Sequence, residues 1–278
     1  MSDRRNRVGG GVFVLRSLFF DRAGTGGGFG SISARMTGVR LASVLSASFE
    51  TFFPCLCLHC GEPVGGDRVG LCDTCWTTVI PHEGQPCPRC GGPSAGDPPL
   101  CLSCQSSPPP QSGTILWGEY DGALRSAILA LKKRGHDPIS PHLARRLSTR
   151  IAAEGWTETV DTVTHVPSHR FRTVRLGWSA AACLAHDVAR ELGVPAQRML
   201  RRRGLARQTG RTRAQRMGMS RHSFSCRRPL DGRHVLIIDD VATTGTTLRR
   251  VAEVLLLAGS EIVYCAAMAA TPDARRVT

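Results

Sequence analysis

The chain has 278 residues, 41% of them hydrophobic, which is enough for one domain with a substantial core and a smaller unit beside it. Its formal net charge of +14 favours anionic partners, either phosphates or nucleic acid. No apolar run approaches the ~20 residues that span a bilayer, so we expect no membrane span and a cytoplasmic protein.

The N-terminal region changes character near Met36. Residues 1–36 are rich in glycine and arginine and have no hydrophobic periodicity. Such a segment buries too little apolar surface to offset the entropy cost of ordering, so we expect a disordered leader. Because the patterned sequence begins after Met36, we expect this residue as an alternative start of translation. Residues 37–54 place apolar side chains at roughly helical spacing, which predicts an amphipathic helix.

Residues 55–104 contain four Cys-x-x-Cys pairs at near-equal gaps. Each pair can direct two thiolates at one metal, and two pairs complete the tetrahedral sulfur shell that zinc prefers. The spacing is typical of metal binding rather than of a disulfide framework, and it indicates a double zinc ribbon in a reducing compartment. The expected ligands of this structural Zn²⁺ are Cys57, Cys60, Cys72, Cys75, Cys87, Cys90, Cys101 and Cys104.

Sequential pairing is the arrangement that we expect, with the first two pairs on one ion and the last two on another. Interleaved pairing and a degenerate site are the alternatives. Cys55 is an alternative ligand but is better interpreted as a spare thiol, and His59 and His82 as surface residues. The remaining cysteines, Cys183, Cys226 and Cys265, are expected to be core or incidental thiols.

A proline- and serine-rich linker at residues 105–113 leads to an α/β domain that we expect over residues 114–271. Strands that alternate with helices predict a mainly parallel sheet with helices on both faces. Strands are predicted at 114–120, 160–166, 235–238 and 261–267, and helices at 122–133, 141–153, 179–192 and 246–258.

One motif carries the functional signal, a buried strand followed by two acids and a Thr/Gly-rich turn that opens a helix. At the carboxyl end of a parallel strand, such a turn lies where open α/β sheets bind ligands. Helix amides and threonine hydroxyls would hold a phosphate, and the two carboxylates suit the vicinal diol of a sugar. The motif comprises Asp239, Asp240, Val241, Ala242, Thr243, Thr244, Gly245, Thr246 and Thr247.

The string from Val235 to Thr247 resembles the phosphoribosyl pyrophosphate (PRPP) fingerprint of type I phosphoribosyltransferases. With the cysteine region and the stretches 120–125, 131–135 and 208–210, the chain is similar to the ComF (competence protein F) family. That family joins such a domain to an N-terminal cysteine ribbon.

The resemblance implies a ligand, PRPP or another phosphorylated ribose, that binds with Mg²⁺. The two acids would hold the ribose hydroxyls and the loop the 5-phosphate. Residues 166–170 would face the pyrophosphate, and residues 204–222 would close over the site. The candidates for the pyrophosphate side are Lys132, Pro167, Ser168, Arg170 and Arg207.

Two functions compete at this point. One is transfer of the phosphoribosyl group to an unnamed acceptor with release of pyrophosphate. The other is a non-catalytic module that binds single-stranded DNA and competence proteins in DNA uptake and natural transformation. Eleven arginines between Arg198 and Arg228 favour DNA, although this cluster has few aromatic side chains for stacking. The family usually has Asn-Gln where this chain has Ser179-Ala180, and Asn where it has Met219. The loss of these amide side chains affects catalysis more than ligand binding.

Overall fold

The computed structural model describes residues 55–64, 70–79, 81, 86–94, 99–134, 138–167, 179–202 and 223–271. All of them belong to one compact unit, Phe52–Thr278. The expected leader at 1–36 and the expected helix at 37–54 lie outside the described residues.

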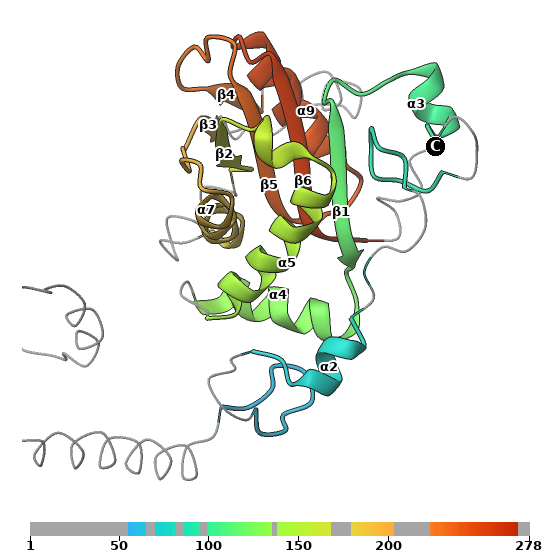
Figure 1. Ribbon diagram of the computed structural model, residues 1–278, viewed down its shortest axis with the longest axis vertical. Coiled ribbons are helices and arrows are strands. Elements are labelled where there is room, and N and C mark those ends of the chain that lie inside the picture. The colour runs from blue at the N-terminus through green and yellow to red at the C-terminus, as the bar shows by residue number, and fades with distance from the viewer. Residues whose placement is uncertain are drawn as a thin grey trace, which may run out of the picture. The chain divides into compact units, whose positions relative to one another are not determined.

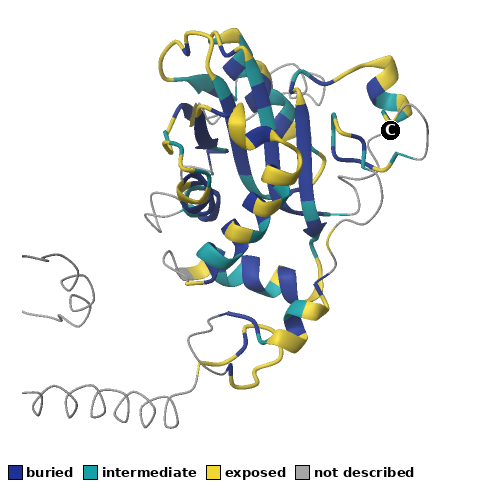
Figure 2. Ribbon diagram, viewed as in Figure 1, coloured by how far each residue is buried: buried dark blue, intermediate teal, exposed yellow. Residues whose placement is uncertain are grey.

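Four parallel strands form the main sheet in the order β1–β6–β5–β2 (Figure 1). The two central strands are nine residues long. The apolar run Val235–Ile238 of β5 is buried, as is β6 apart from Ile262 and Tyr264 (Figure 2). This pattern is typical of parallel strands that are covered on both faces. The strands are β1 Gly113–Glu119, β2 Thr162–His165, β5 His234–Ala242 and β6 Ile262–Ala270.

Helices cover the two faces of the sheet unequally. Leu236 and Ile238 of β5 share a core cluster with three helices, whereas Val235 and Ile237 share the other cluster with α9. Successive side chains of a strand alternate between faces, so the apolar run of β5 serves both clusters. The helices on the first face are α4 Gly122–Arg134, α5 Ile139–Ala153 and α7 Ala180–Leu192, and α9 on the second face is Thr246–Leu257.

Several short elements complete the fold. A two-stranded antiparallel sheet pairs β3, Leu200–Arg202, with β4, Phe224–Cys226. The 3-10 turn η1 spans Trp156–Glu158. In the cysteine region, α2 spans Asp73–Thr77 and α3 spans Leu102–Ser106.

The first half of the ribbon packs into the core of the α/β domain. Leu71 and Cys75 belong to the same buried cluster as the helices of the first face. Gly70, at φ +104°, allows a close approach, because a Cβ there would lie 2.1 Å from Cδ1 of Ile139. The Arg146 guanidinium stacks 3.6 Å above the Trp76 ring. These contacts make the ribbon a part of the domain's core.

The second half of the ribbon covers β1, which is an edge strand of the sheet. The Thr114 N–H donates to the Pro88 carbonyl at 3.0 Å, and the Thr114 hydroxyl donates to the Arg89 carbonyl at 2.8 Å. These bonds satisfy backbone groups that an open sheet edge would expose to another chain.

The segment predicted as a linker is short and well packed. α3 extends to Ser106 and β1 begins at Gly113. Between them Gln111 is buried, and the Ser112 N–H donates to the Val263 carbonyl at 2.7 Å.

Within the described parts of the chain, no helix has the length and apolar character needed to cross a membrane.

Candidate functional site

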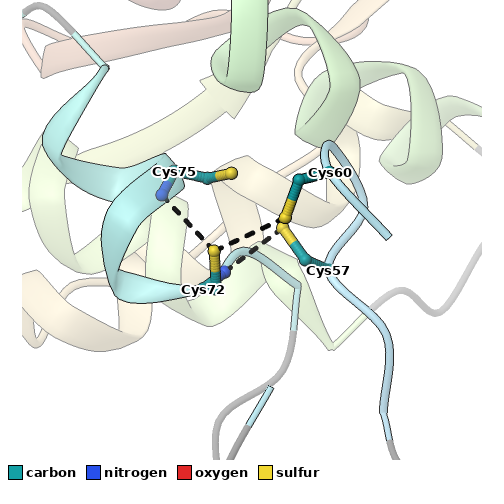
Figure 3. Close-up of side chains that lie close together, drawn as sticks. All are labelled: Cys57, Cys60, Cys72 and Cys75. Atoms are coloured by element: carbon teal, nitrogen blue, oxygen red, sulfur yellow. Dashed lines mark hydrogen bonds between the residues drawn. The ribbon is translucent and has the colours of Figure 1, made fainter. Parts of the chain in front are cut away.

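The eight expected cysteine ligands form two groups of four. Each tetrad has its Sγ atoms within 4.8 Å of one another. The sequential pairing is therefore confirmed (Figure 3 shows the first tetrad). Cys55 lies in neither tetrad, and His59 instead contacts the Ser126 hydroxyl at 3.1 Å. The tetrads are Cys57, Cys60, Cys72 and Cys75, and Cys87, Cys90, Cys101 and Cys104.

The sulfur geometry fits zinc. The Sγ atoms of Cys60 and Cys72 lie 3.7 Å apart, as do those of Cys90 and Cys101. A tetrahedron with Zn–S bonds of about 2.3 Å has edges of roughly 3.8 Å. Four sulfur ligands leave no open position for a substrate, so each ion would be structural.

Backbone amides prepare the tetrads for metal by favouring the thiolate. Burial raises the pKa of Cys57, but N–H donors that include the Cys72 amide, 3.3 Å from Sγ, outweigh burial and lower this pKa to about 6. In the second tetrad, the pKa of Cys87 falls to about 7 by the same balance. Burial and neighbouring sulfurs raise the pKa of Cys75 and Cys104, so zinc binding at neutral pH would release protons.

The acid pair, Asp239 and Asp240, lies within the carboxyl end of β5. The strand was predicted to end at Ile238, but it continues to Ala242 because its last residues pair with β6, Asp239 opposite Ala267. The Asp240 carboxylate forms an ion pair with Lys132 of α4, whose Nζ lies 3.0 Å from Oδ2. The same Nζ lies 5.7 Å from the centre of the Tyr120 ring.

Asp239 is held in an environment that disfavours its charge. Burial raises its pKa well above the usual range, and the neighbouring Asp240 carboxylate raises it further. The Asp240 amide, which donates to Asp239 Oδ1 at 2.9 Å, and the Lys132 charge only partly offset this effect. The fold therefore keeps a carboxyl group at a position where an unpaired carboxylate costs stability. Such positions are frequent at functional sites.

The turn after the acid pair presents an open helix N-terminus. Gly245 precedes α9 with φ +68°, a conformation that glycine adopts without strain. The N-cap residue Gly245 has no side chain that could cap α9; the Thr244 hydroxyl donates to the Thr246 hydroxyl at 3.0 Å and accepts the Thr246 N–H at 3.5 Å. Free amides at a helix N-terminus are a natural anion site.

The structure brings together some of the pyrophosphate-side candidates. Lys132 contacts the acid pair directly. Pro167 is buried directly after Val166, whose N–H donates to the Ile238 carbonyl at 3.0 Å, and it therefore lies beside the strand that carries the acids. Ser168, Arg170 and Arg207 lie outside the described residues, as does the segment 204–222 with Met219. Ser179 precedes α7 and Ala180 begins it.

Two polar residues near the turn were not predicted, Arg249 of α9 and Gln111. Both line a cavity of about 100 Å³ between the turn and the second cysteine tetrad. Gln111 stands in a stretch that composition marks only as a linker, and Arg249 is one of many arginines, so neither carried a local signal.

Comparison with known proteins identifies both halves of the chain. A family model described as Double zinc ribbon domain matches residues 48–110, and one described as Phosphoribosyl transferase domain matches 179–277. A relative from Salmonella typhi, DNA utilization protein YhgH, is 30% identical over 216 residues, which cover 76% of this chain and 94% of that protein. Competence protein F from Haemophilus influenzae is 26% identical over 226 residues, with the same coverage.

Among solved structures, glutamine PRPP amidotransferase from B. subtilis aligns with a TM-score of 0.38 and 23% identity, covering 51% of this chain and 30% of that one. The two family models agree with the fold and with the paired cysteine tetrads. The chain belongs to the ComF family, in which a double zinc ribbon precedes a type I phosphoribosyltransferase-like domain.

Proposed function

We propose that this protein binds PRPP, or another ligand with a ribose 5-phosphate group, at the carboxyl end of β5. The observation that carries the proposal is the acid pair, in which Asp239 is kept in an unfavourable environment and Asp240 is paired with Lys132. The N-terminus of α9, with Gly245 as its N-cap residue, follows within a few residues. Together these groups provide acceptors for a diol and donors for a phosphate.

Each part of the site has a separate task in this proposal. Asp239 and Asp240 accept hydrogen bonds from the two ribose hydroxyls, which supply the donors that both carboxylates need. The turn 243–247 and the amides of α9 bind the 5-phosphate. Lys132 neutralises Asp240 before the ligand arrives and then lies close enough to bind the pyrophosphate of PRPP. Mg²⁺ would enter with that pyrophosphate and offset its charge.

Phosphoribosyl transfer is the reaction that this arrangement supports. The bond between C1 of the ribose and the pyrophosphate oxygen breaks, and the pyrophosphate leaves with the electron pair. A bond from the acceptor's nucleophilic atom to C1 forms, and the acceptor's proton passes to solvent water. Charge grows on the departing pyrophosphate, where Mg²⁺ and basic side chains such as Lys132 would stabilise it.

Calorimetric titration of the zinc-loaded protein with Mg²⁺-PRPP tests the binding proposal. Replacing Asp239 and Asp240 together by Ala removes two charge-assisted hydrogen bonds, so binding should weaken at least ~100-fold. Unchanged affinity in a folded double variant would contradict the assignment. Release of pyrophosphate in the presence of a panel of nucleobases and amines, at a rate above that of the double variant, tests transfer.

DNA handling is the second function that a specific observation favours. Two relatives bear the names DNA utilization protein and competence protein F. In this chain, β3 carries Arg201 and Arg202 on a two-stranded antiparallel sheet, with Arg201 opposite Ser225 of β4. Arg198 and Arg228 are exposed beside it. This surface suits phosphate contacts with single-stranded DNA and would act together with competence proteins.

The DNA function has its own test. Binding of a fluorescent single-stranded oligonucleotide should weaken steeply as the salt concentration rises, because phosphate contacts release counterions. Replacing Arg201 and Arg228 by Gln should weaken binding and reduce the salt dependence. An affinity that does not change with salt concentration would exclude this surface as the DNA-binding site.

We also infer a cytoplasmic location, because eight ligand cysteines require a reducing compartment.

A further inference from the structure

The ribbon and the proposed phosphate site share a cavity of about 100 Å³. One wall belongs to the second zinc ribbon, the half that carries the second cysteine tetrad, and includes Ser103 and Ser107. The opposite wall is the turn and helix of the phosphate site, with Thr244, Thr246 and Arg249. A cavity of this size holds a few water molecules or one group of about the size of a phosphate.

Gln111 lines this cavity and carries a buried acceptor without a partner. Its side chain is only 4% exposed, and its Nε2 donates to the Thr114 hydroxyl at 3.2 Å. The Thr114 hydroxyl donates its one proton to the Arg89 carbonyl, so the Gln111 amide must offer it Nε2, and Oε1 is left without this partner. Oε1 has no hydrogen-bond partner within the described part of the chain. A buried acceptor of this kind is destabilising until a donor binds it.

Arg249 brings a positive charge to the same cavity. Its backbone N–H donates to the Gly245 carbonyl at 3.0 Å, which fixes it in the first turn of α9. The residue is partly buried, and its guanidinium forms no ion pair with any carboxylate of the described residues. A cation without a carboxylate partner, in the first turn of a helix, favours an anion.

We propose that the second zinc ribbon forms one wall of the ligand site. Arg249 binds the phosphate held at the turn 243–247, and Gln111 accepts a hydrogen bond from a hydroxyl group or water molecule bound with that phosphate. This inference rests on the proposed function and deepens it, because the ribbon then limits which phosphorylated sugar the domain accepts. The first tetrad lines no part of this cavity and serves the core alone.

Five single variants of the full-length, zinc-loaded protein test the proposal by titration with Mg²⁺-PRPP and with ribose 5-phosphate. Gln111→Leu removes the acceptor, Arg249→Gln removes the cation, and Ser103→Leu fills the cavity. Arg250→Gln makes the same charge change one residue along α9, and Ser106→Leu makes the same size change on α3. Neither control residue lines the cavity. Zinc content and melting temperature are measured for all five.

The three cavity variants should each weaken binding about tenfold or more, as expected for the loss of one hydrogen bond to a charged group or for overfilling of the cavity. Both controls should bind as the wild type does. Gln111→Leu should weaken binding without lowering the melting temperature, whereas a purely structural role would lower the melting temperature and leave affinity unchanged. If one cavity variant fails to fold, the ligand affinities of the other two still test the proposal.

The outcomes separate this inference from the proposed function. A wild-type protein that binds the ligands, with all folded cavity variants binding equally well, overturns the role of the ribbon and leaves the acid pair in place. A wild-type protein that binds neither ligand overturns both. Weaker binding confined to the cavity variants supports the ribbon as part of the ligand site.

Discussion

Replacing Asp239 by Asn should weaken ligand binding and stabilise the protein at the same time. Asn keeps the size of the side chain, and its Oδ1 can still accept the Asp240 N–H that now lies 2.9 Å from the Asp239 carboxylate. The substitution therefore removes only the charge. If Asp239 were a structural acid, the same substitution would lower stability and leave ligand affinity unchanged.

The expected gain in stability follows from the raised pKa of Asp239. The folded protein holds this proton more tightly than the unfolded chain, whose pKa is near 3.8, so stability falls as the pH rises from about 3.8 through the folded-state pKa. Asn avoids that loss. Each pH unit by which the folded-state pKa exceeds 3.8 corresponds to ~1.4 kcal/mol at neutral pH. A gain of ~1 kcal/mol would raise the melting temperature by roughly 2–4 °C.

The expected loss in binding is that of one hydrogen bond to a charged group, about 1.5–3 kcal/mol, or roughly 10- to 150-fold in Kd. Thermal melts and calorimetric titrations with Mg²⁺-PRPP at pH 7.5, with zinc content verified, measure both effects. Asp161→Asn is the matched control, because Asp161 accepts the His234 N–H at 2.8 Å at the other end of β5 and should leave affinity unchanged. A destabilised Asp239→Asn variant with wild-type affinity would refute the reasoning.

Three further outcomes follow from the described contacts. Elemental analysis should find two zinc ions per chain, and Cys60→Ser or Cys101→Ser should remove one ion each; full zinc content in either variant would contradict the tetrads. Zinc chelation should lower the melting temperature of the whole α/β domain, because Leu71 belongs to its core cluster; an unchanged domain transition would show that the ribbon packs independently. Lys132→Gln should weaken PRPP binding by about tenfold while ribose 5-phosphate binding changes little, and an equal loss for both ligands would remove Lys132 from the pyrophosphate side.

The long elements were predictable because their residues carry periodic signals. Apolar runs bounded by turn residues indicated all four strands of the main sheet, although β5 extends four residues further than its apolar run. That extension depends on pairing with β6, which no local pattern contains. β3 and β4 were missed because each has only three residues, and Arg201 and Arg202 give β3 no hydrophobic alternation.

The candidate site was predictable only in part. The acid pair and the turn stand together in the sequence, so their chemistry could be inferred directly. Lys132 was a candidate by resemblance, but its ion pair with Asp240 depends on how α4 packs on the sheet. Gln111 and Arg249 are far apart in the chain and line one cavity only in the folded protein. Tertiary packing, and not local propensity, brings these groups together.

A crystal structure of the zinc-loaded protein with Mg²⁺-PRPP tests the central claim most directly. The account predicts ribose hydroxyls within hydrogen-bond distance of Asp239 and Asp240 and the 5-phosphate at the turn 243–247, with metal in both tetrads. A ligand bound elsewhere, with the acid pair free of it, would contradict the proposed function.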